Sequence, residues 1–252
     1  MEKRRTAIVV GAAGGIGRAV CSRFASEGLR VIVIDRDGEG AEKTCKQLAG
    51  EGHEFHGLDV TMEHRVNEVF DEIERREPAG ILVVVAGGPL VDPAKPPTVA
   101  EMSTSEWNDT LALNISGAFY CVRKFAQLRI AVSLEHARIV TLGSVSAQIG
   151  GAPTGVAYVA SKAAVMGMTR QAAAELATAG ITVNCVSPGP ISTPAFFEAT
   201  SEDAIDSIER RVPLGRIGTP DEIAAAVSFL CSTQAAWITG TTLDVNGGVH
   251  MR

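Results

Sequence analysis

The chain contains 252 residues, of which 23 are Lys or Arg and 29 are Asp or Glu, so its formal net charge is −6 at pH 7. This length fits one large α/β domain, and a hydrophobic content of 46% excludes an intrinsically disordered chain. The acidic balance, with no basic cluster beyond residues 3–5, argues against a nucleic-acid partner. Glycine is the one unusual component, because 26 glycines are about one residue in ten against a usual ~7%.

The start of the chain imitates a signal peptide, because Lys3, Arg4 and Arg5 precede the small and apolar residues 6–17. The glycines of that stretch, and Arg18 behind it, instead predict a buried strand that enters a turn. No run of about 18 apolar residues occurs. The sequence therefore predicts no transmembrane helix and a soluble, cytoplasmic protein.

The cysteines are five in number and widely spaced, which predicts free buried thiols rather than disulfides or a zinc site. His53, His56 and Asp59 are close in sequence, but no further ligand joins them. We therefore expect a surface segment there and no metal.

Short apolar runs rich in Val and Ile alternate with helix-length segments along the whole chain. Such runs, without polar alternation, predict strands that are buried on both faces in a parallel sheet. We expect a single-domain α/β fold over residues 1–252, a doubly wound parallel sheet of the Rossmann type with helices on both faces. The expected strands are 7–10, 31–34, 81–85, 138–142, 182–186 and 242–245, and the expected helices are 17–27, 39–51, 63–76, 105–128, 158–179 and 221–232.

Two long connections follow expected strands, namely the proline-rich residues 87–103 and residues 188–213. Long connections in compact folds are often functional. We expect both to form walls of a site, with a substrate lid within residues 189–213.

A glycine cluster follows the first expected strand at Gly11, Gly14, Gly15 and Gly17. Glycines let a backbone turn tightly and approach a pyrophosphate, whose charge then faces the N–H groups that begin the next helix. The spacing differs from the G-x-G-x-x-G of the dinucleotide fingerprint. A strand-to-helix turn without a ligand is an equal alternative for the cluster alone.

Asp35, at the end of the second expected strand, favours the dinucleotide interpretation. It lies 18 residues after Gly17, near the ~20 at which an acidic side chain binds the ribose hydroxyls of adenosine. A carboxylate there repels a 2′-phosphate, so we predict NAD rather than NADP, although Arg36 beside it suits a 2′-phosphate. Asp59 and Val60 would meet the adenine, or Asp59 would cap the following helix.

Tyr158 and Lys162 lie four residues apart on one face of an expected helix. The free phenol has a pKa near 10, so general base catalysis near neutral pH needs a pKa lower by roughly 2–3, to which a nearby ammonium contributes. Such pairs also occur by chance. Ser144 follows the expected strand 138–142, so its hydroxyl is a candidate contact for a substrate oxygen, or a turn serine.

Together with further motifs, these residues resemble the short-chain dehydrogenase/reductase family over essentially the whole chain and in the family's order. The further matching positions are Asp59-Val60, Asn114, Asn184, Pro188-Gly189-x-x-x-Thr193, Gly215-Arg-x-Gly-x-Pro220, Thr239-Gly240 and Gly247-Gly248.

The resemblance implies a catalytic role for four residues. Tyr158 would be the general acid/base, and Lys162 would lower its pKa and bind the nicotinamide ribose. Ser144 would polarise the substrate carbonyl, and Asn114 would hold a water in a proton relay to Lys162. The resemblance also implies cofactor contacts from Gly11, Gly15, Ile16 and Gly17 to the pyrophosphate, from Asp35 to the adenosine ribose, from Asp59 and Val60 to the adenine, from Gly87 to the adenosine, and from Pro188, Gly189, Ile191 and Thr193 to the nicotinamide.

The chain departs from the family at three places. Val10 stands where the family usually has Thr, and Val84-Val85 stand where it usually has an Asn pair, so side-chain hydrogen bonds near the cofactor are lost. The spacing from Ser144 to Tyr158 is one residue longer than expected, which indicates an insertion within residues 147–155. Ser146 is therefore a second candidate for the catalytic hydroxyl.

The implied reaction is hydride transfer between NAD(H) and a secondary alcohol or ketone. The acidic residues 202–209 argue against an anionic substrate, unless they face solvent on an amphipathic helix. An NADPH-dependent 3-oxoacyl-(acyl carrier protein) reductase is the alternative within the family, and a non-catalytic dinucleotide sensor is disfavoured because Ser144, Tyr158 and Lys162 are all present. The resemblance also implies a homotetramer, without a nucleic-acid or membrane partner.

Overall fold

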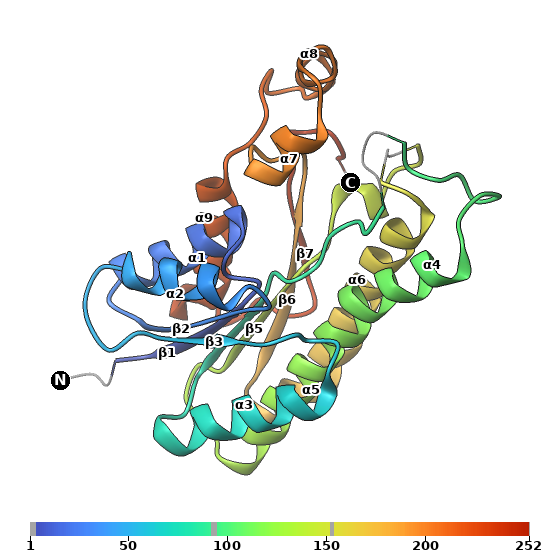
Figure 1. Cartoon of the computed structure of the whole chain (residues 1–252). Helices are drawn as coiled ribbons and strands as arrows, with labels where there is room; N and C mark the ends of the chain where they lie inside the picture. The colour runs from blue at the N-terminus through green and yellow to red at the C-terminus, as the bar shows by residue number, and fades with distance from the viewer. Residues whose placement is uncertain (1–3, 92–94, 152–153, 252) are drawn as a thin grey trace.

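A computed structural model of the chain describes residues 4–91, 95–151 and 154–251. Lys3, residues 92–94 of the first long connection and residues 152–153 of the inserted loop lie outside the described residues. The described chain forms a sheet of seven parallel strands in the order β3-β2-β1-β4-β5-β6-β7 (Figure 1). The strands are β1 Thr6–Val10, β2 Arg30–Asp35, β3 Glu54–Gly57, β4 Ile81–Val84, β5 Arg138–Leu142, β6 Thr182–Pro188 and β7 Thr242–Val245.

The doubly wound order has a functional consequence at β1 and β4. The chain winds outward from β1 to β3 and then returns to place β4 on the other side of β1. The connections that leave β1 and β4 therefore diverge to opposite sides and leave a crevice at the carboxyl ends of these strands. Ligands bind at such a crevice in open α/β sheets.

Helices cover both faces of the sheet, as the continuous apolar strands predicted (Figure 1). One face carries α1 Gly15–Ser26, α2 Gly38–Lys46 and α9 Pro220–Cys231, and the other carries α3 Glu63–Arg76, α5 Gly117–Ala131 and α6 Val156–Leu176. Successive residues of β1 enter the two cores in turn: Ala7 and Val9 enter the α1 side, and Ile8 and Val10 the α5 side. This alternation explains why the strands are apolar at every position.

Two helix predictions were wrong in detail. The helix expected over residues 39–51 ends at Lys46, because Gly50 and Gly52 adopt positive φ angles that a helix does not allow. The helix expected over residues 105–128 is divided into α4 Thr104–Leu111 and α5 by a π-helical turn at Ala112–Ser116. This interruption contains Asn114.

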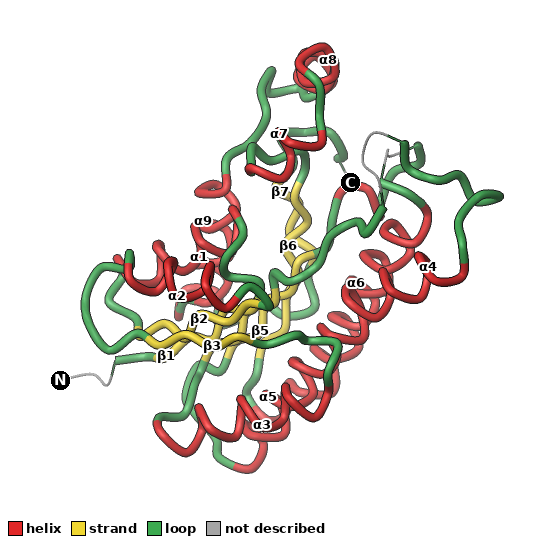
Figure 2. The backbone as a smooth tube through the Cα atoms, viewed as in Figure 1, coloured by secondary structure: helices red, strands yellow, loops and turns green. Residues whose placement is uncertain are grey.

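The connection from β6 to α9 projects beyond the sheet (Figure 2). It contains the short helix α7 Pro194–Ala199 and the helix α8 Glu202–Arg211. No residue of α8 is buried, and Glu202, Asp203 and Asp206 are exposed. The acidic residues thus face solvent on an amphipathic helix, which is the second of the two arrangements that the sequence allowed.

Three further predictions from the sequence, on thiols, a metal site and membrane helices, can be compared with the described residues. All five cysteines are free, and Cys45 alone among them is half-buried rather than buried. Both ring nitrogens of His53 contact backbone atoms, Nδ1 accepting from Val31 N and Nε2 lying 3.0 Å from Ala49 O. No described helix has the length and apolar character needed to cross a membrane.

Candidate active site

The glycine cluster forms a tight turn between β1 and α1, next to the end of β4. Gly11 has a φ of +86°, and a Cβ atom there would lie 2.4 Å from Ala86 N. A Cβ at Gly17 would lie 2.0 Å from Gly11 O. Only glycine fits these two positions, and the close packing leaves the start of α1, from Gly15, at the crevice with no side chain capping its N–H groups.

Asp35 lies beside this turn at the end of β2. Its Oδ2 accepts a hydrogen bond from Ala13 N at 2.9 Å, and its Oδ1 accepts from Asp37 N at 3.0 Å. The neighbouring Arg36 is exposed. The carboxylate is thus held at the rim of the turn, whereas the guanidinium of Arg36 extends from the surface.

The segment after β3 is brought to Asp35 by a backbone hydrogen bond from Leu58 N to Asp35 O, 2.8 Å long. Asp59 Oδ1 accepts from the backbone N and the hydroxyl of Thr61. The N-cap of α3 is Met62, so the helix-cap alternative for Asp59 was wrong. Val60 is buried against the start of α5, where a Cβ at Gly117 would lie 2.6 Å from Val60 Cγ2.

Asn114 connects its π-helical turn to the segment after β4 and to α6. Its Oδ1 accepts from Gly88 N at 2.8 Å, and its Nδ2 donates to Gly88 O and to Ser161 Oγ, each at 3.0 Å. The Ser161 hydroxyl in turn donates to Tyr158 O. π-Helical turns occur frequently at functional sites, and here the turn directs a buried amide between the end of β4 and α6.

Lys162 is buried behind Gly87. Its Nζ donates to Leu142 O at 3.0 Å and lies 5.9 Å from the centre of the Tyr158 ring. A Cβ at Gly87 would lie 2.4 Å from Asn114 Oδ1 and 3.0 Å from Lys162 Nζ. Burial lowers the pKa of Lys162 to about 8, against a smaller opposite effect of the nearby Cys185.

Tyr158 is half-buried on α6, with Ser144 as its neighbour. Burial raises the pKa of the Tyr158 phenol above its ordinary value, and a hydrogen bond with the Ser144 side chain acts in the opposite direction. Without a bound nucleotide the phenol is therefore protonated at neutral pH. The lower pKa that catalysis needs was expected from Lys162 together with a bound nicotinamide, and it stays a prediction.

Ser144 and Ser146 have different surroundings. Ser144 Oγ interacts with Tyr158 and accepts a hydrogen bond from Ser146 N at 3.2 Å. Ser146 is buried and supports Ser144 through its backbone. This arrangement favours Ser144 over Ser146 as the hydroxyl beside the reacting oxygen.

The segment after β6 passes from the sheet to the glycine turn. A Cβ at Gly189 would lie 2.8 Å from Asn246 Cα, and Ile191 is buried. Thr193 caps α7 by accepting from Phe196 N. A Cβ at Gly15 would lie 2.8 Å from Thr193 Cγ2, so the first residues of this connection contact the start of α1.

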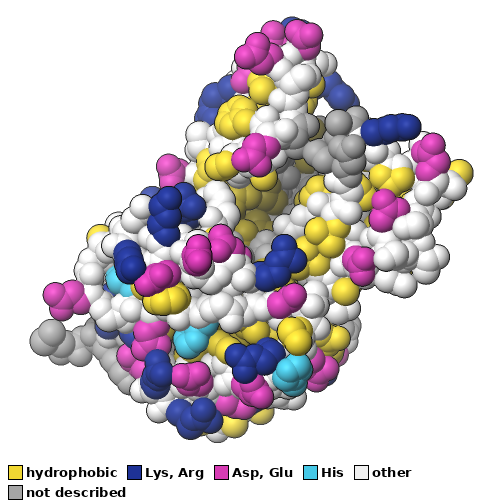
Figure 3. Space-filling model, in the orientation of Figure 1, with side chains coloured by type: hydrophobic (Ala, Val, Ile, Leu, Met, Phe, Trp, Pro, Cys, Tyr) yellow, Lys and Arg dark blue, Asp and Glu magenta, His cyan; other side chains and the backbone are white. Residues whose placement is uncertain are grey.

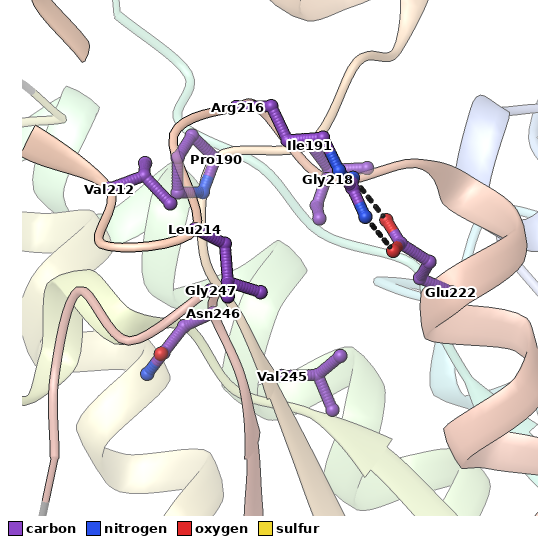
Figure 4. A pocket seen from close by; sticks show the side chains of 10 residues that line it. All are labelled: Pro190, Ile191, Val212, Leu214, Arg216, Gly218, Glu222, Val245, Asn246 and Gly247. Carbon is purple, nitrogen blue, oxygen red and sulfur yellow. Dashed lines mark hydrogen bonds and ion pairs between the residues drawn. The ribbon is translucent and has the colours of Figure 1, made fainter. Parts of the chain in front are cut away.

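Hydrogen bonds join the two ends of the connection between β6 and α9, at its base next to the sheet. Ser192 N donates to Gly218 O and Gly218 N donates to Pro190 O. Arg216 forms a two-pronged ion pair with Glu222 at the start of α9 (Figure 4). The pocket in Figure 4 lies at this base, and none of the catalytic candidates lines it.

A hollow opens below α7 and α8, above the carboxyl ends of the central strands, and hydrophobic side chains line it (Figure 3). Met102 and Val91 of the first long connection lie near the segment before α6, because a Cβ at Gly155 would lie 3.3 Å from Met102 Cε and 3.9 Å from Val91 Cγ2.

Comparisons with known proteins agree with this architecture. A family model described as enoyl-(acyl carrier protein) reductase matches residues 11–250. The chain is 37% identical over 247 residues to the 3-oxoacyl-(acyl-carrier-protein) reductase FabG of Escherichia coli strain K12, and the match covers 98% of both chains. The chain belongs to the short-chain dehydrogenase/reductase family, and it is an oxidoreductase.

Two solved structures of Brucella melitensis proteins are similar to this short-chain dehydrogenase/reductase. One is titled a short-chain dehydrogenase/reductase, glucose/ribitol dehydrogenase, with a TM-score of 0.89, 35% identity, and coverage of 98% of this chain and 97% of the other. The other is a 3-oxoacyl-(acyl-carrier protein) reductase with bound NAD, with a TM-score of 0.88, 28% identity, and coverage of 100% of this chain and 93% of the other.

The residues of this family member fit a nicotinamide dinucleotide. The backbone at Gly11 and Gly17 leaves no room for a side chain, and α1 begins at the crevice without a side-chain cap on its N–H groups. At the positions where the family's side-chain hydrogen bonds are missing, Val10 O accepts backbone hydrogen bonds from both Val85 N and Ala86 N. Residues that the sequence analysis missed are Ser161, which holds Asn114, and Gln148. The Y-x-x-S-K pattern could have indicated the first, but no local signal indicates the second.

Proposed function

We propose that the protein catalyses the oxidation of an uncharged secondary alcohol, and the reverse reduction of the ketone, with NAD as cofactor. The observation that carries this proposal is the arrangement of Tyr158 beside Ser144, with Lys162 and Asn114 behind them at the end of the crevice. A non-catalytic dinucleotide sensor would not need this arrangement.

Tyr158 would accept the proton of the alcohol, or donate one to the ketone oxygen, and Ser144 would hydrogen-bond the same oxygen. Lys162 and Asn114 lie next to Gly87, where they would hold the nicotinamide ribose and pass a proton towards solvent. The bound nicotinamide supplies the hydride acceptor and a positive ring that favours the phenolate. The remaining cofactor contacts would come from Gly11, Gly15, Ile16 and Gly17 at the pyrophosphate, Asp35, Asp59, Val60 and Gly87 at the adenosine, and Pro188, Gly189, Ile191 and Thr193 at the nicotinamide.

The preference for NAD rests on Asp35. Its carboxylate lies at the rim of the glycine turn, where it would accept hydrogen bonds from the ribose hydroxyls and repel a 2′-phosphate. Gly14, within the turn, supplies no compensating positive charge. The bound NAD of the Brucella melitensis neighbour supports the same choice, whereas Arg36 is the residue that would favour NADP.

The substrate would be uncharged and apolar, with residues 189–213 as its lid. The hollow below the lid is lined by hydrophobic side chains, and Phe196 and Phe197 pack edge to face on α7. The second candidate is an NADPH-dependent reductase of 3-oxoacyl thioesters, which the name of the Escherichia coli relative supports.

A substrate screen separates these candidates. Cyclic, aromatic and linear secondary alcohols and a 3-hydroxyacyl thioester are each incubated with NAD or NADP, and the absorbance of the reduced nicotinamide is recorded. We expect turnover of an apolar alcohol with NAD, and none in the Tyr158→Phe variant. Turnover of the thioester alone, with NADP, would establish the second candidate, and no turnover of any compound would contradict both.

We also propose a homotetramer. The family resemblance carries this proposal, and the large apolar side chains of Phe119, Phe229 and Trp237, exposed on the described surface, are candidate contacts between subunits. Sedimentation analysis tests this proposal, since a monomer at micromolar concentration would contradict it.

A further inference from the structure

Gln148 lies at the end of the short turn that begins at Ser144. Residues Val145–Ala147 form one 3-10 turn, and Gln148 follows it as the C-cap. Its backbone N donates to Val145 O at 2.9 Å. Because the turn has a single defined geometry, the position of Gln148 is coupled to that of Ser144.

The side chain of Gln148 points away from this turn to the two neighbouring strands. Its Nε2 donates to Ser187 Oγ at 2.8 Å and to Asp244 Oδ1 at 2.6 Å. Ser187 and Asp244 are paired residues on β6 and β7. Ser187 is completely buried and directly precedes Pro188.

These strands provide a fixed anchor for the turn. β6 pairs with β5 on one side and β7 on the other, and Gly143 N donates to Val186 O at 2.8 Å just before Ser144. The β5–β6 register ends at Leu142 and Val186, so Ser144 and the turn lie beyond the regular pairing. Gln148 extends the connection between the two segments past the end of β5.

We propose that Gln148 is a positioning residue, which holds the Ser144 turn on the ends of β6 and β7 through the Ser187 hydroxyl and the Asp244 carboxylate. A hydrogen bond to a carboxylate is stronger than one between neutral groups, so Asp244 supplies most of the restraint. The inference rests on the proposed role of Ser144. It assigns a function to Gln148, a residue that does not itself reach the reacting atoms.

Removing this restraint has a defined consequence for Tyr158. The Ser144 side chain is close enough to the phenol to lower the pKa of Tyr158 through hydrogen bonding, so displacement of the turn weakens that interaction. A displacement of about 1 Å at a reacting group costs on the order of 100-fold in rate. The strands β6 and β7 keep their own pairing, so the nucleotide site is unaffected.

The test uses four variants of the full chain: Gln148→Ala, Gln148→Glu, Asp244→Asn and the double variant Gln148→Glu with Asp244→Asn. Glu at position 148 faces the Asp244 carboxylate and repels it, whereas the double variant restores a carboxylate–amide hydrogen bond with the polarity reversed. We expect kcat for the fastest alcohol of the screen to fall about 10- to 100-fold in Gln148→Ala and Gln148→Glu. The double variant recovers most of the loss, and the dissociation constant of NAD stays constant throughout.

A second measurement does not depend on turnover. The chain contains only two tyrosines, so tyrosine labelled with ¹³C at the hydroxyl-bearing ring carbon gives two NMR signals, which Tyr120→Phe assigns. Ser144→Ala defines how the Tyr158 signal moves when the hydrogen bond is lost. Gln148→Ala should move it in the same direction, and the double variant should return it towards its original position.

Gln171→Ala is the matched control, because the Gln171 side chain donates to Glu175 on the exposed surface of α6. It should change neither kcat nor the Tyr158 signal. An unchanged Tyr158 signal and unchanged kcat in Gln148→Ala would overturn the proposal, as would failure of the double variant to recover either one. If no alcohol is turned over, the proposed function fails, and the NMR signal still decides the role of Gln148.

Discussion

The proposed catalytic wall, formed by β5 and α6, and the proposed lid, formed by α7 and α8, differ in how they are held. Every residue of β5 is buried, and α6 buries Lys162 and Ser161 in the interior. By contrast, α8 has no buried residue, and Phe197 on α7 is 51% exposed. The reactive groups therefore sit on elements that the core holds rigid, whereas the groups around the substrate sit where substitutions cost the fold little.

The largest expected effect is on the catalytic wall. Tyr158→Phe removes the group that we propose exchanges a proton with the substrate oxygen, so kcat should fall about 10³-fold. The affinity for NAD, measured by fluorescence quenching, should stay nearly unchanged. Tyr120→Phe is the control, because Tyr120 lies half-buried on α5 beside Arg123, and comparable losses in both variants would contradict the assignment.

The glycine turn, which the lid contacts through Thr193, is expected to be rigid like the wall. Gly17→Ala places a Cβ 2.0 Å from Gly11 O, so the turn must shift, with a loss of unfolding free energy of about 1–3 kcal/mol and of nucleotide binding. Urea denaturation and NAD titration measure the two effects. Gly167 lies in the middle of α6, and a Cβ there would have open space around it. Gly167→Ala should therefore stabilise the chain, by up to about 1 kcal/mol.

Asp35 tests whether the cofactor preference depends on one charge. Asp35→Asn keeps the shape of the side chain and removes its repulsion of a 2′-phosphate, so the ratio of kcat/KM for NAD to that for NADP should fall about 10-fold or more. Asp37→Asn is the matched control, since Asp37 caps α2 through Gly40 N and Asn caps a helix equally well. A wild-type preference for NADP would refute the interpretation of Asp35.

Lys162 gives the wall a characteristic pH dependence. Its pKa is about 8 in the folded chain and near 10.5 when unfolded, so the unfolded state binds more protons between these values and stability rises with pH. Without nucleotide, the contribution of Lys162 to the unfolding free energy should increase by about 1 kcal/mol from pH 7 to pH 9. The difference in unfolding free energy between wild type and Lys162→Met should show this increase, and a constant difference would argue against the buried ammonium.

The smallest effect on stability is expected at the lid. Phe197→Ser should change the unfolding free energy by less than about 0.5 kcal/mol, because the ring is exposed. It should raise KM for an apolar alcohol about 3- to 10-fold through lost apolar contact. Val132→Ser is the matched control, because Val132 is also 51% exposed but lies at the end of α5, and it should leave KM unchanged. Equal KM values in the wild type and Phe197→Ser would show that this side chain of the proposed lid does not contact the substrate.

Sequence reasoning succeeded where information is local. Continuous apolar runs identified the central strands, because a strand covered on both faces is apolar at each position. The spacing of Tyr158 and Lys162 placed both on one helix, and the glycine spacing located the turn before α1. The end of α2 was missed because the positive φ angles at Gly50 and Gly52 depend on the contacts of the following loop.

The sequence by itself thus determined the family and the order of the elements, and it predicted which groups react. Only the tertiary structure decided how these groups act together: Asn114 reaches Ser161 across 47 residues, and Gln148 reaches Asp244 across 96. It also decided how closely Tyr158 is packed, so that burial raises the pKa of its phenol without nucleotide. The physical reason is that periodicity records which face of an element is buried, whereas hydrogen bonds and desolvation depend on the segments that the fold brings against that face.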